Sequence, residues 1–64
     1  MLFDTDYVIY DEANDHVLQY DDGLIIVYGI MEEALNDLYG NERVVRCTDL
    51  PKHWQEKLLN EINQ

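Results

Sequence analysis

The order of apolar and polar positions over the first 28 residues predicts three β-strands. Residues 7–10 are β-branched or aromatic, residues 16–20 alternate as a half-buried strand does, and residues 24–28 form a continuous apolar run. The polar break before residue 16 contains Asn14 and Asp15, which tolerate the left-handed backbone conformation. Asp22-Gly23 is a hairpin signal, because glycine accepts a positive φ freely. We therefore expect an antiparallel meander.

Helical spacing replaces this pattern after Gly29. Apolar residues then recur every three or four positions, at Met31, Ala34, Leu35 and Leu38. Gly40-Asn41 is a suitable end for this helix. Residues 43–47 form a short candidate strand that would extend the sheet, and a second helix is expected to begin at residues 49–51, where Pro51 is accepted in the first turn. Its apolar stripe consists of Trp54, Leu58 and Ile62, with Leu59 beside them.

The predicted elements are too small to be stable apart, so we expect one α+β domain over residues 1–64. A hairpin alone is marginal, and a helix of about ten residues needs packing. The order is βββαβα: a three-stranded antiparallel meander, a helix, a short strand and a C-terminal helix. If both faces of residues 24–28 are covered, either the helices lie on opposite faces or one face meets a second copy of the chain, which would form a homodimer. The expected core is Ile9, Leu18, Ile26, Leu35, Leu38, Val45, Trp54, Leu58 and Ile62.

Charge is distributed unevenly along the chain. There are 14 acidic and 4 basic residues, a net charge of −10, and residues 1–42 contain eleven of the acids and no Lys or Arg. Self-repulsion opposes compaction, and a mixture of Lys and Glu would maintain solubility about as well. The excess of carboxylates therefore indicates a basic partner. It argues against direct binding of DNA or RNA, whose phosphates it would repel.

The predicted meander sorts its acids into two groups. Both turns are acidic, with Asp11, Glu12 and Asp15 in the first and Asp21 and Asp22 in the second. Antiparallel pairing would bring Asp4 and Asp6 to the same end as the second turn, and a strand of about five residues would separate the groups by roughly 17 Å. Two such groups could imitate the spaced phosphates of a nucleic-acid strand, or the aspartates could simply solvate turns. If these turns are the contact surface, we expect that reversing Asp11, Glu12 and Asp15 together to Lys abolishes partner binding and leaves the fold intact.

Tyrosines supplement the acids as candidate contact residues. Tyrosine offers a large area with a polar tip and is enriched at interfaces. On neighbouring strands some of the five tyrosines should form a cross-strand row, or they flank the core with their hydroxyls in water. The predicted partner-binding set is Asp4, Asp6, Asp11, Glu12, Asp15, Asp21, Asp22, Glu32, Glu33, Tyr10 and Tyr20.

No residue set indicates catalysis, and we expect no cofactor or metal. Residues 11–16 have Ala13 where an EF-hand requires a ligand, and they lack its glycine. Cys47, the only cysteine, is expected on the core side of its strand as a small hydrophobe, not as a nucleophile paired with His16 or His53. A chain of 64 residues also leaves little room for a deep pocket.

Three features of the sequence predict that the protein is located in the cytoplasm. The chain contains no apolar run of about 18 residues, so we expect no membrane span. The first six residues lack the basic and apolar regions of a signal peptide. A single cysteine allows no internal disulfide and fits a reducing compartment.

The chain resembles the short acidic proteins that bacteriophages encode to block host defences, including anti-CRISPR and anti-restriction inhibitors. The resemblance rests on its size, on the exclusively negative charge of residues 4–42 and on its βββαβα layout. The resemblance implies a non-enzymatic inhibitor, in the host cytoplasm, that covers a basic surface of a nucleic-acid-binding host protein. The basic residues between Arg43 and Lys57 depart from a uniformly acidic mimic. The alternative is a general interaction module, such as an antitoxin or accessory subunit, that uses its tyrosines and second helix.

Overall fold

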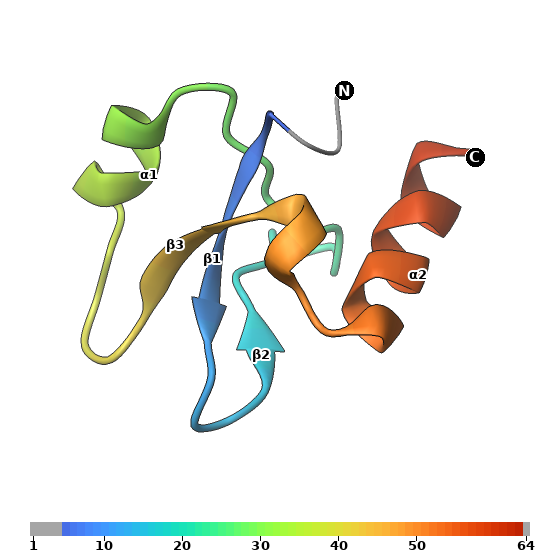
Figure 1. Ribbon diagram of the computed structural model, residues 1–64, viewed down its shortest axis with the longest axis horizontal. Coiled ribbons are helices and arrows are strands. Elements are labelled where there is room, and N and C mark those ends of the chain that lie inside the picture. The colour runs from blue at the N-terminus through green and yellow to red at the C-terminus, as the bar shows by residue number, and fades with distance from the viewer. Residues whose placement is uncertain (1–4, 64) are drawn as a thin grey trace.

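A computed structural model describes residues 5–63, in which a three-stranded antiparallel sheet lies between two helices (Figure 1). The α+β class is therefore confirmed. A single 3-10 turn, Cys47–Asp49, leads from the sheet into the second helix. The elements in chain order are β1 (Tyr7–Asp11), β2 (His16–Val17), α1 (Met31–Asn36), β3 (Arg43–Arg46) and α2 (Lys52–Ile62).

β1 is the central strand of the sheet, with β2 on one side and β3 on the other. Tyr10 pairs with Val17 of β2 and with Arg43 of β3, and both pairings are antiparallel. The β-branched and aromatic residues of β1 suit a strand that is covered on both faces. The prediction of a three-stranded meander is wrong about the third strand, which is β3 and not residues 24–28.

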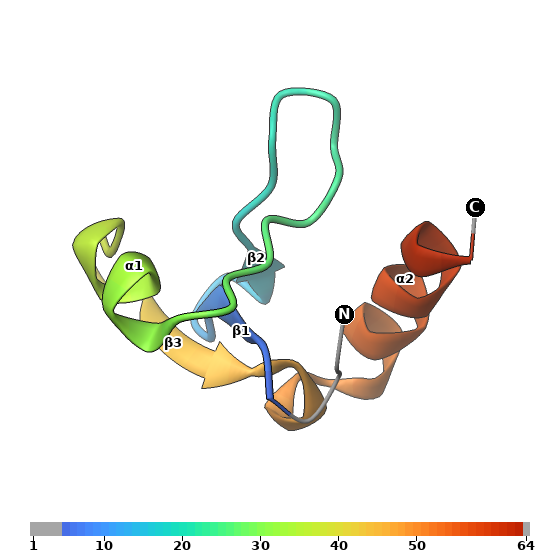
Figure 2. The ribbon, with the colours of Figure 1, turned by 90° about the horizontal axis from the view of Figure 1, so that it is seen from above.

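Residues 19–27 leave the sheet and form a projecting loop (Figure 2). Gln19 and Ile25 form an isolated bridge across the loop, and the amide of Tyr20 donates to the carbonyl of Leu24 at 2.8 Å. Gly23 has a φ of 88°, as the Asp-Gly signal predicts. The turn was thus predicted correctly, but the regular strands on either side of it were not.

One edge of β1 is shared by two separate segments. The amide of Leu18 donates to the carbonyl of Ile9 at 2.9 Å, after which pairing with this part of the chain stops. Tyr28 then returns to the start of β1 and exchanges two backbone hydrogen bonds of 2.8 Å with Tyr7. The apolar run at residues 24–28 is therefore partly buried without forming a strand.

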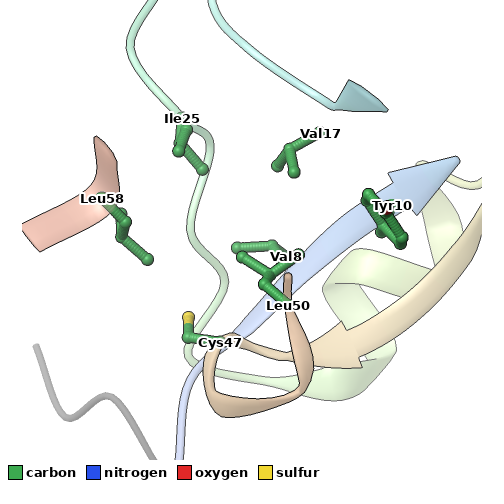
Figure 3. Packing of buried hydrophobic residues seen from close by; sticks show 7 residues of the cluster. All are labelled: Val8, Tyr10, Val17, Ile25, Cys47, Leu50 and Leu58. Atoms are coloured by element: carbon green, nitrogen blue, oxygen red, sulfur yellow. The ribbon is translucent and has the colours of Figure 1, made fainter. Parts of the chain in front are cut away.

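The alternation of β1 divides the core between the two faces of the sheet. Val8 and Tyr10 point to the face covered by the 3-10 turn and α2, and Ile9 points to the face covered by α1. The helices thus lie on opposite sides of the sheet, which was one of the two predicted alternatives. The first cluster contains Val8, Tyr10, Val17, Ile25, Cys47, Leu50 and Leu58 (Figure 3). The second contains Ile9, Tyr28 and Ala34.

Two of the nine predicted core residues are exposed. Leu35 is 49% exposed because α1 turns Ala34 toward the sheet, and the next residue is rotated by about 100°. Ile62 is 43% exposed for a similar reason, since Glu61 and not Ile62 meets the rest of the protein. Ile9 and Leu58 are buried as predicted. The other five are partly buried against the clusters: Leu18, Ile26, Leu38, Val45 and Trp54.

Candidate interaction surface

The carboxylate of Asp11 holds the turn between β1 and β2 in place. It accepts hydrogen bonds from the amides of Ala13 and Asn14 at 3.1 and 3.4 Å, and from the side-chain amide of Asn14 at 2.7 Å. The side-chain hydrogen bond from Asn14 is the main reason that the pKa of Asp11 lies below its ordinary value. Asp11 is therefore part of the turn structure and not simply a solvated charge.

Asp15 connects the same turn to α2. Its Oδ1 accepts hydrogen bonds from the Tyr10 hydroxyl at 2.7 Å and from the Trp54 indole at 3.0 Å, and its Oδ2 lies 2.8 Å from His53 Nε2. The hydroxyl of Tyr10, the indole and His53 hold the pKa of the carboxyl below its ordinary value, while desolvation opposes them. The residue adopts a φ of 49°, the left-handed conformation predicted for this loop. These contacts contradict the expectation that all charges of this turn can be reversed without affecting the fold.

Glu12 is the remaining acid of this turn, and it forms an ion pair with β3. Its carboxylate lies 3.0 Å from the guanidinium of Arg43, and both side chains are more than half exposed. An exposed pair of this kind contributes little to stability, because water and salt screen it. The pair does, however, neutralise one of the four basic residues of the chain.

The second acidic turn lies on the projecting loop, which is attached to α2. Asp22 accepts a hydrogen bond from the amide of Leu24 at 3.0 Å and so stabilises the turn. Glu61 accepts from the amide of Ile25 at 2.7 Å and pairs with Lys57 at 2.9 Å. The carboxylate of Asp21 makes no hydrogen bond or ion pair within residues 5–63. Glu61 is absent from the predicted contact set, although its spacing of four from Lys57 is that of a helical ion pair.

The predicted grouping of the acids is only partly observed. Figure 2 shows the projecting loop on the far side of the molecule from the start of β1, so the second acidic turn and the start of the first strand do not share one end of the molecule. The carbonyl of Asp6 instead accepts from the amide of Cys47 at 3.1 Å. Asp4 lies outside the described residues. The turn residues Asp11, Glu12 and Asp15 do lie together, as predicted.

α1 carries two exposed acids in its first turn. Glu32 and Glu33 lie there, where the partial positive charge of the helix end favours carboxylates. Neither carboxylate makes a hydrogen bond or ion pair with the described part of the chain. The first turn of α1 therefore presents uncompensated negative charge to solvent.

The five tyrosines occupy different environments. Tyr10 is buried, and its pKa is raised to about 12, mainly by the hydrogen bond to Asp15. Tyr28 is also buried and donates to Asp37 at 2.7 Å, and desolvation is the main cause that raises its pKa to about 12. Tyr7 of β1 forms an isolated bridge with Tyr28, while Tyr20 and Tyr39 are 57% and 85% exposed. Of the two tyrosines in the predicted contact set, Tyr20 is accessible and Tyr10 is in the core.

Cys47 is a buried residue of the first core cluster, as predicted. Burial is the main cause that raises the pKa of its thiol to about 11, and the charge of Asp6 adds to this. A thiol with such a pKa is almost entirely protonated at neutral pH, and the thiolate is the nucleophilic form. Its surroundings are therefore those of a packing residue.

Residues 5–63 enclose no pocket. Their His, Cys, Asp and Glu side chains form no group of three or more that could hold a metal ion. Neither helix described has the length and apolar character needed to cross a membrane. No protein-family model, curated protein or solved structure matches the chain.

Proposed function

We propose that the protein is an acidic inhibitor that binds a basic, nucleic-acid-binding surface of a host defence protein. The observation that carries this proposal is the surface location of its negative charge. Every acidic residue except Asp4 lies within residues 5–63, and no charged residue in that range is buried. Residues 5–63 thus present thirteen acidic against four basic side chains, a net charge of −9, outside the core. Such a surface attracts Lys and Arg side chains that would otherwise neutralise phosphate.

The acids divide into those that stabilise the fold and those that are available to a partner. Asp11, Asp15 and Asp22 each accept hydrogen bonds within the chain, so part of the acidic composition has a structural reason. Asp21, Glu32 and Glu33 are exposed and have no partner within residues 5–63. We assign these three carboxylates to partner binding, because they contribute least to the structure of the protein itself.

Capture from bacterial lysate tests the proposal. Nuclease-treated lysate is passed over the immobilised protein at increasing salt, and retained proteins are identified by mass spectrometry. We expect basic nucleic-acid-binding proteins, eluted by a few hundred millimolar salt because exposed charges are screened over about 8 Å at 0.15 M. Duplex DNA should displace them, because it competes for the same Lys and Arg groups.

Two variants that change the charge in opposite directions test the proposal further. Reversal of Asp21, Glu32 and Glu33 to Lys should abolish capture while the circular dichroism spectrum stays unchanged. The control Lys52→Glu changes an exposed charge of α2 and should retain capture. Capture that survives both the triple reversal and high salt would contradict the proposal.

The alternative of a general interaction module is favoured by one observation. Leu59 and Ile62 of α2 are 46% and 43% exposed and lie three residues apart, so they share one side of the helix. A partner that binds there would be retained at high salt and lost on Leu59→Ser. The salt dependence of capture therefore distinguishes the two functions.

A further inference from the structure

α1 buries its smallest apolar residue and exposes its larger ones. Ala34 is fully buried against the second core cluster. Met31 and Leu35 are 46% and 49% exposed, and Ile30, which immediately precedes the helix, is 57% exposed. An amphipathic helix normally turns its large apolar side chains inward. In α1 the large side chains instead remain about half exposed to solvent.

Two of the exposed residues form a stripe along α1, and the third lies next to its start. Met31 and Leu35 are four positions apart, so they are neighbours on the same side of the helix. Ile30 immediately precedes the helix in an extended conformation and adds a third exposed apolar side chain at this end of α1. Figures 1 and 2 both show α1 at one end of the molecule, away from α2 and the projecting loop. The stripe is therefore accessible to another molecule.

Charge around the stripe determines what kind of molecule can cover it. Glu32 lies three positions before Leu35 and so borders the stripe on the helix surface. Glu32 and Glu33 have no partner within residues 5–63, and α1 itself contains no Lys or Arg. A symmetric contact between two copies would bring these carboxylates together around the same apolar area. A partner with Lys or Arg beside an apolar groove would satisfy both features.

We infer that Ile30, Met31 and Leu35 are the apolar anchor of the interface, inserted into a groove of the basic partner whose rim of Lys and Arg meets Glu32 and Glu33. This inference rests on the proposed function and specifies the site. Insertion of helical apolar residues at spacing i, i+4 into a groove is a common mode of recognition. The buried anchors supply most of the affinity in such contacts, and the charged rim supplies association rate and specificity.

Two synthetic helical peptides of equal positive charge provide the probe. One carries leucines along one face with flanking lysines, and in the other each leucine is replaced by serine. The protein should bind the leucine peptide about tenfold more tightly, a difference typical of one buried anchor. In NMR titrations the backbone amides of residues 30–36 should shift most. Leu35→Ser should remove the preference for the leucine peptide, whereas Leu59→Ser, a leucine of similar exposure on α2, should keep it.

Each contrary outcome has its own meaning. Equal, salt-sensitive binding of both peptides would overturn the apolar anchor and leave the charge-led function standing. Failure of both peptides to bind at low salt would overturn the anchor and the proposed function together. Loss of the preference in Leu59→Ser alone would move the anchor to α2. A concentration-dependent dimer in analytical ultracentrifugation that Leu35→Ser abolishes would show that a second copy covers the stripe.

Discussion

Two neighbouring leucines of α2 should differ sharply in their effect on stability. Leu58 is 2% exposed and belongs to the first core cluster, whereas Leu59 is 46% exposed. Leu58→Ala removes three buried carbon groups at about 0.8 kcal/mol each and leaves a small cavity. It should therefore lower the free energy of unfolding by about 3 kcal/mol. Leu59→Ala creates no cavity, and the higher helix propensity of alanine offsets part of the lost contact. The free energy of unfolding should therefore fall by less than about 1 kcal/mol in Leu59→Ala.

Urea unfolding followed by circular dichroism and by the fluorescence of Trp54 measures both variants. A chain of 64 residues has a total stability of roughly 3–10 kcal/mol. With a slope of about 1 kcal/mol per molar urea, Leu58→Ala should lower the midpoint by about 3 M or leave the chain unfolded. Equal losses for the two leucines, or a loss under about 1 kcal/mol for Leu58→Ala, would refute the packing of α2 against the sheet.

The remaining predictions concern ionisable side chains. Asp15→Asn should lower the melting temperature at pH 7, whereas Asp21→Asn should leave it unchanged, and calorimetry that shows equal losses would contradict the role of Asp15. The pKa of Asp15 is depressed in the folded state, so its contribution is complete above the unfolded pKa of about 3.9 and is lost as the pH falls through the folded value. The difference in melting temperature between the wild type and Asp15→Asn should therefore shrink below about pH 4. Iodoacetamide at pH 8 should alkylate Cys47 far more slowly in the folded than in the urea-unfolded protein, because burial raises the pKa of the thiol to about 11. Rapid labelling of the folded protein, measured by mass spectrometry, would contradict the burial of Cys47.

Local chemistry in the sequence predicted the turns and the existence of both helices, although α1 ends at Asn36, before the predicted stop at Gly40-Asn41. Gly23 and Asp15 adopt the positive φ that their residue types allow, and α2 has a buried side. The apolar run at residues 24–28 was misjudged, because continuous hydrophobicity reports burial and does not distinguish a strand from an irregular segment. The pairing of Arg43–Arg46 with β1 is a competition between distant segments, which no local pattern reveals.

The candidate surface was harder to predict than the fold class. Composition identified the acids, but it could not separate structural carboxylates from available ones. Asp15 meets Trp54 across 39 residues of sequence, a contact that only the tertiary fold creates. Leu35 was placed in the core by its helical spacing, and its exposure depends on how α1 rotates against the sheet. The stripe on α1 could therefore be recognised only in three dimensions.

The central position of β1 also determines when the sheet can be completed. β1 and β2 form a local hairpin, but Ile9 pairs with Val44, about 35 residues further along the chain. Closing so long a loop costs entropy before any contact compensates for it, which slows folding. Until Arg43–Arg46 is available, one edge of β1 keeps unpaired amides and carbonyls that can bind the strand of another molecule. A nascent chain that has reached only residue 42 thus contains its most hydrophobic strand in its most aggregation-prone form.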